Sequence, residues 1–267
     1  MAAKGLQGDA ANRYETHMPY GLYISADGAQ AQTDRLDVIA NNLANVETLG
    51  FKRELSILQS RYAEAAQQGV ATPGSGSLDD LGGGVRLQGT TTDFSTAAVK
   101  QTGSPTDMAI QGEGFFLVRK GDDTYLTRAG NFRISGSGEL LTQQGYPVLS
   151  DSRTPITIRP DGGPWKTTAE GSILQNGVAQ NLALVKPASL GDLASVGENL
   201  FRPLAEAQAL PSAERNVASG CVELSGVQPT TELIDMLETS RLIEANVNMI
   251  KTQDEMLSGL VSRVLKA

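Results

Sequence analysis

Apolar residues recur with the period of a helix near both ends of this chain, and with the period of strands between them. Over residues 19–44, small and apolar positions alternate in steps of four and three, which predicts one long helix with a heptad seam. Gly50 follows as a C-terminal stop, and Phe51 can fold back onto the last turn. The seam consists of Leu22, Ala26, Ala29, Thr33, Leu36, Ala40 and Leu43, with Ile39 and Val46 beside it.

The strongest periodic signal covers residues 230–265 and predicts a second long helix. Thr230 or Thr231 can cap its start, directly after Pro229. The steps of three and four continue over roughly four heptads, which is long enough for a coiled coil. Since neither helix has a helical neighbour in sequence, we expect the two to pair with each other and with copies from other chains. The seam consists of Leu233, Met236, Ser240, Ile243, Val247, Ile250, Asp254, Leu257, Val261 and Val264.

Between these helices the pattern changes to short apolar runs separated by turn residues. Turn pairs such as Asp161-Gly162 and Asn176-Gly177 favour hairpins, and strands at this spacing predict an antiparallel sandwich or barrel-like domain. A short helix is expected over residues 190–196. The expected strands cover residues 108–111, 115–119, 125–128, 132–134, 139–142, 146–149, 156–159, 173–175 and 182–186.

The predicted fold class is therefore α+β, with a mainly antiparallel β domain inserted between N- and C-terminal helices that pair as a coiled-coil-like helical domain. Residues 1–17 are expected to form a polar, disordered extension, and Met18 stays open as an alternative start. We expect a discontinuous helical assembly domain from residues 18–68 and 222–267, a linker at 69–84 and a β domain at 85–221. The linker is rich in glycine and serine, and no Gly-Lys-Ser/Thr follows it, so a phosphate-binding loop is not expected there.

Composition narrows the function classes. The net charge of −8 argues against a nucleic-acid partner, which requires a basic surface. Only 5% of the residues are aromatic, which does not suit a ring-lined ligand pocket. The chain has no apolar run of membrane-spanning length, so no membrane insertion is expected. Residues 1–17 have no apolar core of a cleaved secretion signal.

Candidate chemistry is sparse. The single histidine, His17, and the single cysteine, Cys221, are too few for a Cys/His or Ser/His/Asp catalytic set or a zinc site. The Gly112-Glu113-Gly114 segment precedes a strand instead of opening a helix, so it indicates a tight turn and no dinucleotide site. We therefore expect no enzyme, no catalytic or metal-binding residue and no cofactor. Acidic turn residues that match no calcium loop, and are expected to be solvated, are Asp79, Asp80, Asp122, Asp123 and Asp151.

Three segments, taken in order, resemble the flagellar rod and hook family, and together they cover nearly the whole chain. Residues 39–52 read IANNLANVETLGFK, similar to the family's Asn-rich helix end with a Thr-x-Gly-Phe-Lys stop. Residues 106–118, with 125–132 and 138–142, are similar to the opening of its β domain. Residues 232–257 resemble its C-terminal helix.

The resemblance implies a structural subunit of the basal-body rod that assembles through its terminal helices into the axial drive shaft and transmits torque. It implies export without a cleaved signal by the flagellar type III apparatus, a place in the periplasmic part of the basal body, and partners among copies of itself and other rod proteins. Amides at the end of the first helix can fix register between helices, or can simply terminate that helix. The candidate assembly interface is Leu36, Ile39, Asn41, Asn42, Leu43, Asn45, Phe51, Met236, Ile243, Val247, Ile250, Leu257 and Val261.

Within the family, two departures favour the proximal-rod over the distal-rod branch. The last helix reads Ser240-Arg241-Leu242-Ile243-Glu244 where the distal branch usually has Gln-Arg-Ala-Tyr-Glu. Ser225-Gly226-Val227 stands where Ser-Asn-Val is usual. The alternatives are a distal rod or hook-type axial subunit, or a secreted β-domain binding module, for which Trp165 and scattered tyrosines are the only aromatic candidates.

Overall fold

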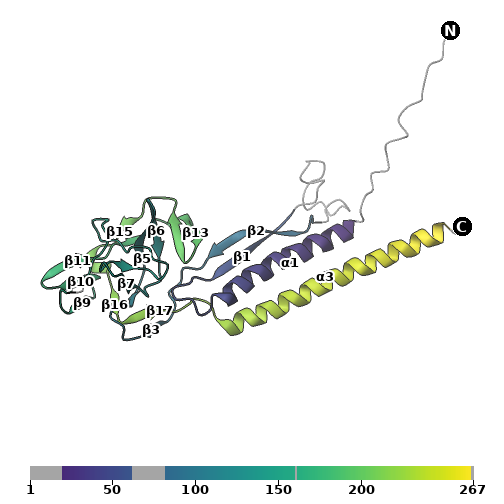
Figure 1. Ribbon diagram of the computed structural model, residues 1–267. Coiled ribbons are helices and arrows are strands. Elements are labelled where there is room, and N and C mark those ends of the chain that lie inside the picture. The colour runs from purple at the N-terminus through teal and green to yellow at the C-terminus, as the bar shows by residue number, and fades with distance from the viewer. Residues whose placement is uncertain (1–19, 62–81, 160, 266–267) are drawn as a thin grey trace, which may run out of the picture. The chain divides into compact units, whose positions relative to one another are not determined.

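The computed structural model describes residues 20–61, 82–159 and 161–265 (Figure 1). The expected α+β class is confirmed, because long helices near both ends of the described chain flank a series of antiparallel strands. The predicted extension at residues 1–17 and most of the predicted linker lie outside the described residues.

The elements are α1 (Tyr20–Ala44), β1 (Glu54–Ser60), β2 (Val85–Thr92), β3 (Val99–Gln101), β4 (Met108–Ile110), β5 (Phe115–Lys120), β6 (Asp123–Thr127), β7 (Arg133–Ile134), β8 (Leu140–Leu141), β9 (Trp165–Thr167), β10 (Ser172–Gln175), β11 (Val178–Asn181), β12 (Leu184–Lys186), η2 (Leu190–Asp192), β13 (Leu193–Gly197), β14 (Leu200–Pro203), β15 (Gln208–Ala209), η3 (Ser212–Glu214), β16 (Val217–Ser219), β17 (Cys221–Glu223) and α3 (Pro229–Val264).

The chain folds as two compact units. Unit 1 takes its described residues from the stretches 1–37, 56–89 and 235–267. Unit 2 consists of residues 38–55 and 90–234. The last turns of α1 therefore belong with the strands of unit 2, whereas the predicted division placed them in the helical domain. The predicted division into domains stays a prediction.

The largest sheet of unit 2 has six strands in the order β13-β14-β6-β5-β12-β15, and its strands pair antiparallel. A separate three-stranded sheet runs β11-β10-β9. Side chains alternate across β5 and β6, as the strand period requires. Phe116, Val118 and Tyr125 face one apolar cluster, whereas Phe115 and Leu117 face another. The core of the β domain is thus built on both faces of this central pair.

Within unit 1, α1 lies beside both α3 and the two-stranded β1–β2 ribbon (Figure 1). A Cβ at Gly21 would lie 2.9 Å from the Gln253 side chain, and one at Gly28 would lie 3.3 Å from the Asn246 amide. Later residues of α1 thus meet earlier residues of α3, so these helices run antiparallel. The two glycines let the helices approach closely at these points.

The predicted seam of α1 is not the buried face of that helix. The buried side chains of α1 are Ser25, Ala31, Ile39 and Asn42, while Ala26, Thr33 and Ala40 of the predicted seam are exposed. The reason is that α3 and the ribbon occupy the other sides of the helix.

The prediction of a short helix over residues 190–196 is wrong, because only the 3₁₀ turn η2 forms there and β13 follows directly. Within the described residues, every helix is too short or too polar to cross a membrane.

Candidate functional site

The segment that follows α1 meets the end of the β domain and the start of α3 inside unit 2. We call this region the junction, and define it by the residues that join its parts. They come from the end of α1 and the turn after it, from the turn after β6, from β17 and from the first turn of α3. The junction residues are Asn42, Gly50, Lys52, Arg53, Arg128, Glu223 and Glu232.

Asn42 fastens the end of α1 to the start of β1, and its side chain is almost fully buried. Its Nδ2 donates to the carbonyl oxygen of Glu54 at 2.8 Å, and its Oδ1 accepts from the Glu54 backbone N–H at 2.9 Å. The same Nδ2 lies 3.4 Å from Oε2 of Glu232. Because an amide side chain both donates and accepts, it satisfies the two backbone groups of Glu54 at once.

The turn after α1 runs so close to the β-domain backbone that residue 50 has no room for a side chain. Gly50 has a φ of +69°, in the left-handed region that favours glycine. A Cβ here would lie 2.5 Å from the backbone nitrogen of Ala129 and 2.6 Å from the carbonyl carbon of Arg128. The Gly50 N–H donates to the carbonyl oxygen of Glu223 at 2.9 Å. The glycine therefore lets this turn contact two segments that are distant in sequence.

Lys52, Arg128 and Glu223 form a buried charge cluster at the junction. Nζ of Lys52 lies 2.7 Å from Oε1 of Glu223 and also donates to the carbonyl oxygen of Ser95 at 2.7 Å. Nη1 of Arg128 lies 3.5 Å from Oε2 of Glu223. The backbone N–H of Ala97 donates to Oε1 of the same carboxylate at 3.1 Å. One carboxylate thus serves two cations and joins the segment after α1 to β17.

Burial dominates the electrostatics of this cluster. It lowers the pKa of Lys52 from its ordinary value, although the hydrogen bond and the charge of Glu223 oppose the shift. Burial also lowers the pKa of Arg128, and Nε of that guanidinium has no hydrogen-bond partner within the described residues. Desolvation of such groups is costly, so the cluster specifies one geometry more than it adds net stability.

Glu232 holds the first turn of α3 to the same segment. Its side chain is fully buried, and its Oε1 accepts a hydrogen bond from Nε of Arg53. Its other oxygen faces the amide of Asn42. A carboxylate in the first turn of a helix also suits the positive end of the helix dipole. The end of α1 and the beginning of α3 therefore share one carboxylate in unit 2.

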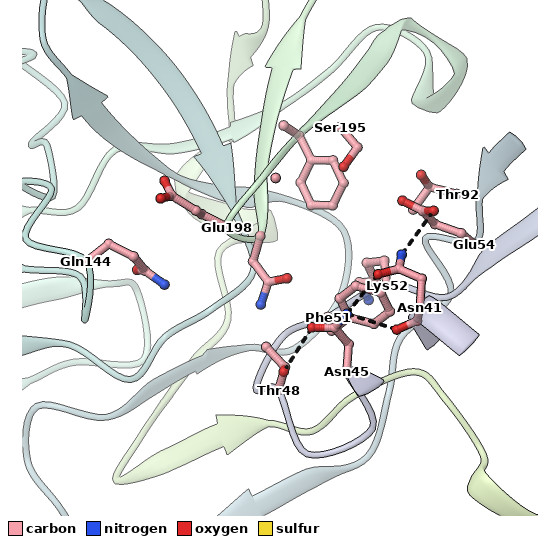
Figure 2. A pocket seen from close by; sticks show the side chains of 13 residues that line it. Asn41, Asn45, Thr48, Phe51, Lys52, Glu54, Thr92, Gln144, Ser195 and Glu198 are labelled. Atoms are coloured by element: carbon pink, nitrogen blue, oxygen red, sulfur yellow. Dashed lines mark hydrogen bonds between the residues drawn. The ribbon is translucent and has the colours of Figure 1, made fainter. Parts of the chain in front are cut away.

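A polar cleft of about 200 Å³ opens beside the turn after α1. Figure 2 shows Asn41, Asn45 and Thr48 on one side of it, with Gln144 and Glu198 on the other. Nδ2 of Asn45 donates to the carbonyl oxygen of Asn41 at 2.9 Å and to its Oδ1 at 3.1 Å. The Thr48 hydroxyl donates to Oδ1 of Asn45 at 3.2 Å. These side chains bind one another and the last carbonyls of α1, which terminates the helix.

The far wall of the cleft is the turn between β13 and β14. Glu198 and Asn199 have φ values of 56° and 58°, the conformation that two-residue hairpin turns require. Nδ2 of Asn199 donates to the carbonyl oxygen of Leu49 at 3.0 Å. Oε2 of Glu198 accepts from Nζ of Lys120 at 2.7 Å and from the Tyr146 hydroxyl at 2.8 Å. The hydrogen bond from Lys120, followed by that from Tyr146, lowers the pKa of Glu198.

The chemistry of the junction is that of segments binding one another. Its carboxylates are engaged by cations: Glu223 by Lys52 and Arg128, and Glu232 by Arg53. Among the residues that the structure describes, no three His, Cys, Asp or Glu side chains gather as a metal ion would need. The arrangement fixes the path of the backbone between the terminal helices and the β domain.

The predicted interface residues are spread over several environments. Ile39 and Asn42 are buried inside the chain, whereas Asn41, Val247 and Val261 are exposed. Their role between subunits stays a prediction. The half-buried members are Leu36, Leu43, Asn45, Phe51, Met236, Ile243, Ile250 and Leu257.

Sequence reasoning did not assign a role to most of the junction. Lys52 and Gly50 belong to the Thr-x-Gly-Phe-Lys stop, and their place in that motif was the available signal. The partners of this lysine lie far away in the sequence, so local periodicity could not indicate them. The unassigned junction residues are Arg53, Arg128, Glu223 and Glu232.

Comparison with known proteins identifies the class. Residues 22–52 match the family described as "Flagella basal body rod protein". Residues 109–179 match "Flagellar hook protein FlgE/F/G D1 domain", and residues 218–263 match "Flagellar basal body rod FlgEFG protein C-terminal". The discontinuous helical ends and the inserted β domain are thus those of an axial protein of the flagellum.

Proteins that match this chain over nearly their whole length narrow the class from axial proteins of the flagellum to rod proteins. A "Flagellar basal-body rod protein FlgF" of Caulobacter vibrioides is 31% identical over 93% of this chain and 99% of its own. "Flagellar basal-body rod protein FlgG" of Bacillus subtilis is 32% identical, and that of Buchnera aphidicola is 34% identical, each over 90% of this chain and 97% of its own. This chain belongs to the flagellar basal-body rod protein family, and it is a structural subunit of the rod.

Proposed function

We propose that this rod subunit joins copies of itself and other rod proteins through α1 and α3, which pair as a coiled coil and together form part of the axial shaft that transmits torque. The observation that carries this proposal is the amount of apolar side chain that α3 exposes. A surface helix normally presents one apolar stripe and keeps its other sides polar. Exposed apolar residues of α3 are Leu233, Ile234, Leu237, Leu242, Val247, Met249, Met256, Leu260, Val261 and Val264.

The physical gain from covering this surface is large. Burial of apolar area contributes about 25 cal/mol per Å², so a helix that packs along its length against neighbours gains attraction that does not depend on covalent links. An exposed apolar surface of this kind marks a site of protein association in a protein that works inside an assembly. The rod proteins to which this chain is similar support the same assignment.

The junction supplies the mechanical part of the function. A shaft transmits torque only if the β domain cannot swing freely on the helices. The buried charge cluster, the Asn42 clamp and the close approach at Gly50 together hold the helix ends to the β-domain backbone inside unit 2. We assign the junction the task of making that connection stiff.

The family supports a proposal for the export route and the location of this protein. We propose export in unfolded form by the flagellar type III apparatus and a place in the part of the rod that crosses the periplasm, without enzymatic activity. Of the rod positions, we assign it to the proximal rod on the residues at 225–227 and 240–244. Relatives of both FlgF and FlgG names match at similar identity, so a complementation assay in strains that lack one or the other protein tests this assignment.

Hydrogen exchange on the purified full-length protein tests assembly through the helices. At low concentration we expect slow exchange in the core strands β5 and β6 and fast exchange in α1 and α3, because the helices become fully ordered only when neighbours cover them. At high concentration, or with a second rod protein added, exchange in the helices should slow. A protein that stays monomeric with both helices slowly exchanging would contradict the proposal.

A further inference from the structure

The helix α3 carries a second heptad seam, beside the row that faces α1. Leu242, Met249 and Met256 recur at seven-residue intervals and are 45%, 55% and 58% exposed. Ala245 and Thr252 alternate with them and are exposed too. No charged residue interrupts this row. We call it the outer seam of α3, made of Leu242, Ala245, Met249, Thr252, Met256 and Gly259.

The helix α1 carries a matching row, part of the seam predicted from the sequence. Leu22, Ala29 and Leu36 are half-buried, and Ala26 and Thr33 between them are exposed. This row also contains no charge. We call these five residues the outer seam of α1. Both outer seams therefore repeat about every 10.5 Å along their helices. Large side chains occupy three of the six positions on α3 and two of the five positions on α1.

Other sides of the two helices make contacts within unit 1. The row of α3 that faces α1 is polar, since Asn246 and Gln253 lie against Gly28 and Gly21. On another side of α1, Arg61 of the ribbon contacts the Tyr23 hydroxyl at 3.1 Å. The outer seams are thus uncharged heptad rows that the fold of unit 1 leaves partly or fully exposed.

The polar atoms in the outer seams are satisfied within their own helices. The Thr33 hydroxyl donates to the carbonyl oxygen of Ala29 at 2.9 Å. The Thr252 hydroxyl donates to the carbonyl oxygen of Asn248 at 2.9 Å. Each threonine can therefore present its methyl group outward, and another helix can cover these rows without leaving an unpaired hydroxyl.

The two outer seams lie on opposite sides of the helix pair. The seam of α1 follows its contact row by one residue, as Ala29 follows Gly28. The seam of α3 follows its contact row by three residues, as Met249 follows Asn246. The contact row of each helix is the row that faces the other helix. In an antiparallel pair of right-handed helices, the residues one position after the two contact rows lie on the same side of the pair. The residues three positions after the contact rows lie on the opposite side. A contact between the two seams therefore needs two copies of the chain.

We propose that the outer seam of α3 in one copy packs into the outer seam of α1 in the next copy, head to tail. This inference rests on the proposed assembly through the helices and specifies which faces meet. The three large side chains of the α3 seam recur every seven residues, and the small side chains Ala26, Ala29 and Thr33 of the α1 seam leave room for them, as holes receive knobs. Because each copy uses two different surfaces, the contact repeats without an end and generates an open helical array.

Cysteine cross-linking of full-length protein tests the pairing of the seams. In a C221S background, A29C and M249C place one thiol in each seam. An equal mixture of the two variants should give a disulfide-linked heterodimer on mild oxidation, and each variant alone should stay uncrosslinked. The double variant A29C/M249C should give a ladder of multimers. The matched control N248C replaces the residue next to Met249 on a neighbouring face, and should not cross-link to A29C.

Sedimentation at the same concentrations separates this inference from the proposed function. If the protein associates but M249C links to itself, or N248C links to A29C as well as M249C does, the head-to-tail contact is wrong and assembly through the helices survives. If the protein associates and no pair of thiols links, the seams do not meet and the inference is again wrong. If the protein never associates, both the head-to-tail contact and the proposed assembly through the helices are wrong.

Discussion

Charged side chains are buried at the junction, whereas large apolar side chains are exposed on α3. In most folded proteins the distribution is the reverse. The buried charges of Lys52, Arg128 and Glu223 pair with one another inside a single chain, and only Nε of Arg128 lacks a partner among the described residues of this cluster. The exposed apolar residues of α3 are not covered by other residues of unit 1. The difference separates what the subunit must fix by itself from what it leaves for its neighbours.

The largest expected effect is that of G50A, which tests whether the junction tolerates any rearrangement. The new Cβ would meet the Ala129 backbone at 2.5 Å in a conformation that alanine disfavours. We expect a loss of about 5 kcal/mol in the free energy of unfolding, measured by urea denaturation. The control G136A adds a Cβ that meets nothing within 4 Å. Equal stability of the two variants would show that the turn after α1 is plastic.

Next in size is K52M, which breaks the buried charge cluster from one side. Glu223 would keep only the Arg128 contact at 3.5 Å and the N–H of Ala97. Removal of one partner from a buried pair costs about 3–4 kcal/mol because the other charge stays buried. Thermal and urea unfolding measure the loss.

The double variant K52M/E223Q sharpens this result. Since it removes the orphaned charge, it should recover part of the lost stability, which a double-mutant cycle measures. If both single changes and the double change add without coupling, the two side chains do not act as a pair.

A smaller effect, about 2 kcal/mol, is expected from N42A. This change leaves the N–H and the carbonyl oxygen of Glu54 without their side-chain partner. The neighbouring N41A is the matched control, because Asn41 is exposed and should change stability by less than about 0.5 kcal/mol. A reversed order of the two would mean that the asparagines act at the helix surface instead of at the clamp.

The smallest change in stability is expected from M249D on the other side of the comparison. Met249 is 55% exposed, so the free energy of unfolding should shift by less than about 0.5 kcal/mol. Self-association should nonetheless be lost, because a charge would enter the outer seam of α3. Analytical ultracentrifugation with circular dichroism measures both. If M249D unfolds, or still associates like the wild type, the outer seam of α3 does not serve association without affecting stability, and the comparison with the junction fails.

The helices could be predicted from the sequence almost to the residue. Residues 19–44 and 230–265 were expected, and α1 and α3 span Tyr20–Ala44 and Pro229–Val264. The heptad period and the stop at Gly50 are local signals, and they suffice for elements of this length. The α+β plan follows from the same signals.

The partners of those elements could not be predicted in the same way. The apolar seam of α1 was expected to face α3, yet the side that faces α3 contains Gly21 and Gly28. Periodicity indicates which residues share a face, and says nothing about whether that face meets its own chain or another. β13 was missed for a related reason, since it pairs with β14 through a bulge and carries little alternation.

The junction escaped prediction because its contacts join the two ends of the chain. Lys52 and Glu223 are 171 positions apart, and Arg53 and Glu232 are 179 apart. A charged residue in a signature motif resembles a surface residue until its partner is known. Only the fold brings these side chains together.

The length of those separations sets an order of events for a chain that emerges N-terminus first. The turn around Gly50 is among the first parts to appear, yet two of its charged partners, Glu223 and Glu232, arrive only near the end. The ion pair of Lys52 and the hydrogen bond of the Gly50 N–H, both made with Glu223, therefore form only when nearly the whole polypeptide has passed. The contacts to which we assign the stiffness of the subunit are thus among the last that the chain can complete.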